Sequence, residues 1–123
     1  MRSIQAVIEV PAVRFEELVG DALDGIPDEL ARLIDNVVVV VEDGWPGGGL
    51  LGRYQGVPLT ERGAWYGAVG TTMPDRITIF RLPICGLCST EDEVVEQVKV
   101  TVVHEVAHHF GIDDRRLTQL GWG

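Results

Sequence analysis

The 123 residues of this chain suffice for one domain with a single core, and are too few for a scaffold plus a separate regulatory domain. The formal net charge of −9 repels phosphate backbones, which argues against nucleic acid as the main partner. No apolar run approaches the roughly 20 residues of a membrane helix, and the N-terminal sequence, interrupted by Glu9 and Pro11, carries no convincing signal peptide. We therefore expect one cytoplasmic domain over residues 1–123, without membrane contact.

Apolar spacing predicts two helices and a strand at the start of the chain. Residues 13–24 place their apolar side chains on one helical face, and Gly25 and Pro27 break the pattern. Residues 27–34 predict a second, short helix, with a tolerated first-turn proline followed by two acids that favour the positive end of the helix. The run "VVVVV" at 37–41 has the length of a strand, and its uniform apolarity predicts burial on both faces.

The middle of the chain is rich in glycine and proline, which predicts loops around two further strands. Within it, "LLGRYQG" at 50–56 is a plausible short strand. Residues 75–84, "DRITIFRLPI", alternate in polarity around Ile77 and Ile79, which predicts a strand that ends before Pro83.

The valine-rich residues 90–110 favour a strand by propensity alone. Three features nevertheless predict a helix. Thr90 and Glu93 form a capping-box pattern, Gly111 stands where a helix C-cap would, and valines recur at helical spacing. Those valines are Val95, Val98, Val102 and Val106. The following "DDRRLTQ" can start a short helix capped by an aspartate.

The two cysteines, Cys85 and Cys88, form a C-x-x-C pair. Such a pair is either a redox motif or half of a four-ligand zinc site. The zinc site would need a second pair of ligands nearby, and the histidines lie on another element. The pair follows a predicted strand and precedes a helix, which is compatible with redox chemistry. We favour two reduced thiols in a loop.

All three histidines of the chain lie in "HEVAHH", which contains the pattern H-E-x-x-H. On a helix, His104 and His108 are about 6 Å apart along the axis and within about 40° in azimuth, so both imidazoles can bind one ion. Glu105 can lean over that ion without ligating it. His109 points about 100° away from His108, and we interpret it as a surface or supporting imidazole.

A catalytic zinc ion needs a third protein ligand and one open position. The motif continues as H-x-x-G-x-x-D, because Gly111 and Asp114 follow His108 at that spacing. Glycine permits a left-handed conformation that reverses the chain, so Asp114 can return to the ion and ligate it through its carboxylate. Asp113, one position earlier, remains an alternative third ligand, although the spacing favours Asp114.

These residue types predict hydrolysis. Zinc lowers the pKa of a bound water towards 7, and Glu105 accepts its proton as the water attacks a carbonyl, then delivers it to the leaving amine. An extended substrate can pair with an exposed strand edge, for which the strand around 76–82 is the candidate. An additional donor to the oxyanion is usual. The candidates for that donor are Tyr54, Tyr66, Arg76 and Arg115.

The segment "TVVHEVAHHFGIDD", with "LLGRYQGVPL" and "RITIFRLPI" upstream, resembles the small bacterial zincin-like metallopeptidases, sometimes called minimal zincins. The resemblance covers about residues 15–120. It implies a compact α+β fold, in which the H-E-x-x-H helix packs on a small mixed sheet. It also implies that His104, His108 and Asp114 ligate zinc and that Glu105 is the catalytic base.

The chain departs from the larger metzincins in two respects. Their position equivalent to Asp114 is usually histidine, and a methionine turn follows their motif. Here the only methionines, Met1 and Met73, both lie upstream of the motif.

We predict a zinc-dependent peptidase that cleaves a peptide or flexible protein segment, because so short a chain has little material for walls around a substrate. A non-peptide amide fits the same residues. A zinc endoribonuclease is a second hypothesis, but such enzymes have glycine where Glu105 stands, and the charge of −9 opposes RNA binding. The third is a non-catalytic metal-binding or interaction module. In that case the tail "LGWG", with Trp122, would dock on a partner, whereas closing the core is its simpler role.

Overall fold

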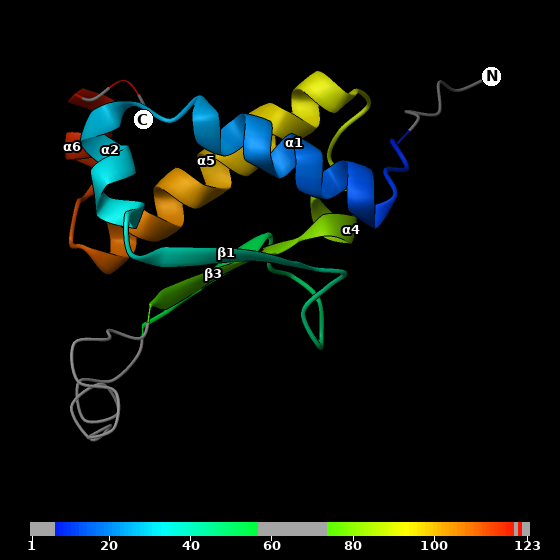
Figure 1. Cartoon of the computed structure of the whole chain (residues 1–123), viewed down its shortest axis with the longest axis horizontal. Coiled ribbons are helices and arrows are strands. Elements are labelled where there is room, and N and C mark those ends of the chain that lie inside the picture. Colours follow the sequence, from blue (N-terminus) through cyan, green and yellow to red (C-terminus); the bar gives the residue numbers. More distant parts are fainter. Residues whose placement is uncertain (1–6, 57–73, 120, 122–123) are drawn as a thin grey trace.

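The structure is a computed structural model that describes residues 7–56, 74–119 and 121. Helices α1 and α5 pack side by side over one face of a three-stranded sheet (Figure 1). This arrangement is the predicted α+β fold, with the H-E-x-x-H helix on a small mixed sheet. In chain order the elements are α1 (Ala12–Asp24), α2 (Asp28–Ala31), the 3-10 turn η1 (Arg32–Ile34), β1 (Val37–Glu42), β2 (Gly52–Gln55), β3 (Asp75–Phe80), α4 (Arg81–Cys85), α5 (Glu91–His109) and α6 (Asp114–Gln119).

The two N-terminal helices confirm the predicted pattern. Helix α1 follows Pro11, and Gly25 ends it by donating its N–H to the carbonyl of Ala22. Helix α2 begins directly after Pro27. The 3-10 turn η1 follows it without a break and ends at Ile34, the last residue of the predicted second helix. The face of α1 that is buried consists of Phe15, Leu18, Val19 and Ala22.

Helix α5 confirms that capping and spacing outweigh the strand propensity of valine. Thr90 Oγ1 accepts a hydrogen bond from the Glu93 N–H at 3.1 Å, as in a capping box. The Glu93 carboxylate in turn accepts from the N–H of Ser89 at 2.6 Å, one residue before the cap. The helix is further stabilised because its apolar side chains are buried against the sheet and α1. The buried residues of α5 are Val94, Val98, Thr101, Val102, Val103, Val106 and Ala107.

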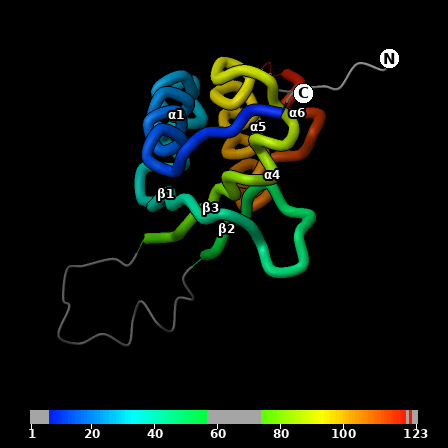
Figure 2. The backbone as a smooth tube through the Cα atoms, turned by 90° about the vertical axis from the view of Figure 1, so that its right-hand side faces the viewer, coloured from blue at the N-terminus to red at the C-terminus, as the bar shows by residue number. Residues whose placement is uncertain are grey.

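The sheet order is β1-β3-β2, with β3 parallel to β1 and antiparallel to β2 (Figure 2). The predicted burial of the first strand on both faces is wrong. Strand β1 lies at an edge of the sheet, and Val38 is 43% exposed. The strand buried on both faces is β3, where the four residues Ile77–Phe80 are all buried. Valine content reports hydrophobicity, whereas the position of a strand in the sheet depends on its pairing partners.

Strand β3 confirms one prediction and corrects another. It ends at Phe80, before Pro83 as predicted, because Arg81 starts α4 and Pro83 lies in the first turn, where a missing N–H is tolerated. The strand around 76–82 was the predicted edge for an extended substrate. Both edges of β3 are paired, to β1 and to β2, so it offers no edge to a substrate.

The two cysteines are buried in the core: Cys85 ends α4, and Cys88 lies in the loop before α5. Both are free thiols, with Cys85 4% and Cys88 3% exposed. Burial raises the pKa of each thiol, which keeps it protonated and unreactive. Their surroundings favour a packing role, in agreement with the prediction of reduced thiols.

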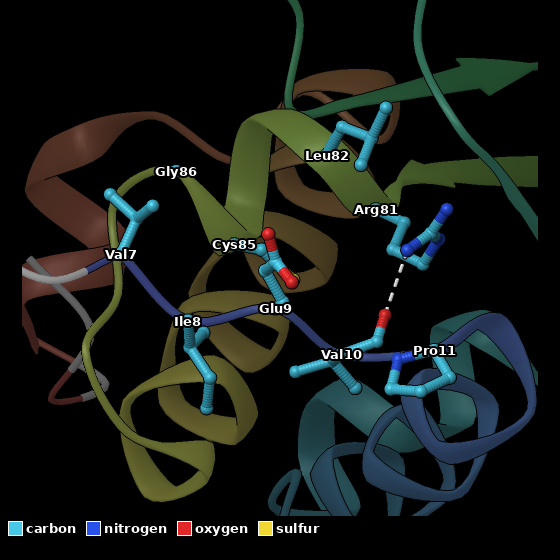
Figure 3. Close-up of a pocket in the computed structure, with 9 residues that line it drawn as sticks. All are labelled: Val7, Ile8, Glu9, Val10, Pro11, Arg81, Leu82, Cys85 and Gly86. Atoms are coloured by element: carbon cyan, nitrogen blue, oxygen red, sulfur yellow. Dashed lines mark hydrogen bonds between the residues drawn. The ribbon is translucent and has the colours of Figure 1, made fainter.

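The N-terminal segment borders an open pocket of about 510 Å³ next to α4 (Figure 3). Arg81 donates a hydrogen bond to the carbonyl of Val10 at 2.7 Å, and the N–H of Ile8 donates to the carbonyl of Cys88 at 2.9 Å. These two bonds anchor the segment before α1.

In the part of the chain that the structure describes, no helix is long and apolar enough to cross a membrane.

Strand β2 approaches α5 so closely that a glycine is required at the contact. A Cβ added at Gly52 would lie 2.7 Å from Thr101 Cγ2 and 3.2 Å from the Thr78 carbonyl oxygen. We expect Gly52→Ala to lower the free energy of unfolding by about 1–3 kcal/mol, because the inserted methyl overpacks this contact. Urea unfolding followed by circular dichroism measures the change.

Gly20→Ala is the matched control, because a Cβ at Gly20 meets nothing within 4 Å and the residue lies inside α1. Alanine there should stabilise the protein by about 0.5–1 kcal/mol through helix propensity. Equal stability of Gly52→Ala and the wild type would contradict the close approach of β2 to α5.

Candidate metal centre

The last two turns of α5 carry the H-E-x-x-H residues. His104 and Glu105 are half-buried, whereas the His108 side chain is 63% exposed. The imidazole centroids of His104 and His108 lie 6.2 Å apart, one helical turn from each other. His104 Nδ1 lies 3.0 Å from the carbonyl oxygen of Val100. As the donor in that bond, Nδ1 carries the proton, and Nε2 keeps its lone pair for an ion.

A Schellman turn after α5 reverses the chain. Gly111 has φ +75°, its N–H donates to the His108 carbonyl at 3.3 Å, and the N–H of Ile112 donates to the Ala107 carbonyl at 2.8 Å. Residues with a Cβ rarely adopt this conformation, which explains the glycine. The predicted reversal at Gly111 is confirmed.

The two aspartates that follow have different surroundings. Asp113 Oδ1 accepts a hydrogen bond from the Arg116 N–H at 2.8 Å, so Asp113 is the N-cap of α6 and the predicted aspartate cap is confirmed. Asp114 Oδ1 lies 3.9 Å from His108 Nε2, and its side chain is 88% exposed. The chain reversal therefore places Asp114 beside His108. Asp113 instead accepts a hydrogen bond from the backbone of α6.

The three predicted ligands come together in two pairs that share His108: His104 with His108, and His108 with Asp114. Within the described ranges, no three His, Cys, Asp or Glu side chains are already grouped closely enough to hold a metal ion. The exposed side chains of His108 and Asp114 have room to change rotamer towards an ion. Two imidazoles and a carboxylate are a ligand set that suits catalytic zinc.

The carboxylate of Glu105 is held by the sheet. Its Oε1 accepts a hydrogen bond from the backbone N–H of Tyr54, on β2, at 3.1 Å. Sequence reasoning considered Tyr54 only as a side-chain donor to the oxyanion. Its hydroxyl instead donates to Asp75 Oδ2 at 2.6 Å. Of the other candidate donors, Arg76 and Arg115 are exposed, and Tyr66 lies outside the described residues.

His109 packs against the sheet. Its ring stacks on Tyr54, with centroids 3.9 Å apart and planes 20° apart, and its Nε2 lies 3.8 Å from Asp75 Oδ2. Sequence reasoning missed Asp75, and no local motif marks it. Only the antiparallel register, which pairs Tyr54 with Ile77, sets Asp75 diagonally across from Tyr54.

A family model described as "Zincin-like metallopeptidase" matches residues 34–122, which include the sheet, α5 and the H-E-x-x-H motif. The chain belongs to this family. No curated protein matches the chain. Membership in the zincin-like metallopeptidases confirms the predicted family, and the description of that family implies metal binding and peptide hydrolysis at the level of the family.

Proposed function

We propose that this zincin-like protein is a zinc-dependent peptidase that cleaves peptides or flexible protein segments. The observation that carries the proposal is the joint placement of the motif residues at the end of α5. His104 and His108 lie one turn apart, Glu105 lies between them in sequence, and the Schellman turn returns Asp114 to His108. The family assignment favours peptide hydrolysis over the ribonuclease hypothesis.

In this proposal His104, His108 and Asp114 hold the ion, which when bound supplies a polarised water and a Lewis acid for the substrate carbonyl. Glu105 is the general base. The bond from Tyr54 N–H fixes Glu105 Oε1, and we assign proton transfer to the second carboxylate oxygen. That oxygen takes the proton of the attacking water and passes it to the leaving amine.

The exposure of the site indicates the class of substrate. His108 and Asp114 are largely exposed, so a substrate reaches them from the surface rather than through an enclosed cavity. An extended peptide or a flexible protein segment can lie across such a surface, whereas a small molecule is usually enclosed on most sides.

We place the reaction in the cytoplasm, where the buried thiols of Cys85 and Cys88 remain reduced.

Metal removal and restoration test the proposal. Purified protein is analysed for metal, stripped with a chelator, and assayed on fluorogenic peptides and an unfolded protein before and after zinc is returned. We expect one zinc per chain, no cleavage after stripping, and recovery at one equivalent of zinc. Zinc binding without any cleavage would support a non-catalytic module instead, and cleavage of RNA but not of peptides would support a nuclease.

A further inference from the structure

Strand β2 and the residue after it run along α5 in a matched register. Every second residue of the strand meets every fourth residue of the helix. Two residues of a strand span about 6.7 Å and four residues of a helix span about 6.0 Å, so the two spacings stay aligned over three contacts. The contacts, in order along both elements, are Gly52 with Thr101, Tyr54 with Glu105, and Gly56 with His109.

The first and last contacts leave little room for a Cβ on the strand. A Cβ added at Gly52 would lie 2.7 Å from Thr101 Cγ2, and one at Gly56 would lie 3.2 Å from His109 Cε1. Between them, the N–H of Tyr54 reaches Glu105 Oε1 at 3.1 Å. A slip of the strand by one residue would turn this N–H away from α5, because successive residues of a strand face opposite ways. The register therefore determines whether Glu105 is held.

His109 joins the helix to both strands at the end of this contact. Its ring lies on the Tyr54 ring at 3.9 Å, and its Nε2 is 3.8 Å from Asp75 Oδ2. The same carboxylate oxygen accepts the Tyr54 hydroxyl at 2.6 Å. Asp75 belongs to β3, and its side chain is only 13% exposed. One carboxylate oxygen of Asp75 thus lies close to side chains from α5 and β2.

We propose that His109 is a positioning residue for the reaction rather than a metal ligand. Together with Tyr54 and Asp75 it fixes the register of β2 on α5, and this register aligns the Tyr54 N–H with Glu105. His109 lies one turn beyond Glu105 on the helix face that meets β2, whereas His104 and His108 lie on the neighbouring face. The inference rests on the proposed function, since Glu105 is the base only in a peptidase.

Two variants of His109 test the inference. His109→Ala removes the ring, and His109→Phe keeps a ring on Tyr54 but loses the nitrogen near Asp75. The readouts are zinc content, kcat and KM of the zinc-loaded protein, and hydrogen exchange of the Tyr54 amide by NMR in metal-free protein. We expect His109→Ala to lower kcat by about 10- to 100-fold, with KM and zinc content unchanged and faster exchange at Tyr54. His109→Phe should restore part of kcat and part of the protection.

Val95→Ala is the control for a general loss of stability, because Val95 is half-buried on α5 but distant in sequence from the three contacts. It should leave kcat and the exchange of the Tyr54 amide unchanged. Loss of zinc in His109→Ala, or unchanged exchange at Tyr54 in both His109 variants, would overturn the inference. A wild-type protein without peptidase activity would refute the proposed function instead. In that case, exchange of the Tyr54 amide in the two variants would still show whether His109 fixes the register of β2 on α5.

Discussion

Replacing Glu105 by Gln is expected to lower kcat by about 10²- to 10⁴-fold, the usual contribution of a general base. The zinc content should stay at the wild-type value, because in the proposed site the metal is held by His104, His108 and Asp114. Glutamine has nearly the same shape, and its amide oxygen can still accept the bond from the Tyr54 N–H that Glu105 accepts. It cannot take up the proton of the attacking water. Steady-state kinetics and metal analysis of the same preparation measure both quantities.

Glu96→Gln is the matched control, since Glu96 lies on the same helix with a side chain that is 65% exposed and pairs with Lys99. It makes the same chemical change away from the motif and should leave turnover at the wild-type rate. If turnover survives in Glu105→Gln, Glu105 is not the base and the proposed mechanism fails.

Asp114→Ala is expected to weaken zinc binding by more than about 100-fold, beyond the range typical of residues that only support a ligand. The removed carboxylate is the one that the chain reversal brings to His108. Asp113→Ala should retain zinc and instead lower stability by about 0.5–2 kcal/mol, because Asp113 caps α6. Competition with a chromophoric chelator measures the affinity, and urea unfolding measures the stability.

These neighbouring aspartates control for each other, because the two variants remove the same group one residue apart. The opposite result, with zinc lost in Asp113→Ala and kept in Asp114→Ala, would exchange their roles. It would require the cap of α6 to open when metal binds, since Asp113 Oδ1 is engaged with the Arg116 N–H.

Features that depend on a few neighbouring residues were predictable. The helix over Glu91–His109 followed from its capping residues, and the reversal at Gly111 followed from the conformational freedom of glycine. The ligand assignment of His104 and His108 remains a prediction, based on a spacing that any helix places on one face. The aspartate cap of α6 is equally local, although the sequence left open which aspartate provides it.

Features that depend on which segments meet were not predictable. The valine run at 37–41 and the mixed run at 75–80 exchanged their expected positions in the sheet, because hydrophobicity does not determine which strand is central. The predicted substrate edge on β3 was wrong for the same reason: the sequence predicts the strand at 75–80 and the short strand at 50–56, but it does not show that the two pair.

The sequence by itself therefore determined the family, the helix that carries the motif, and the residue types that suit a zinc ion. The helix and the residue types follow from local spacing, and the family follows from a few short motifs along the chain. The tertiary structure decided how Glu105 is held and what His109 contacts. Tyr54 lies 51 residues before Glu105, and Asp75 lies 21 residues after Tyr54. Contacts over such separations form only when strand pairing and helix packing set a register, and no local pattern encodes that register.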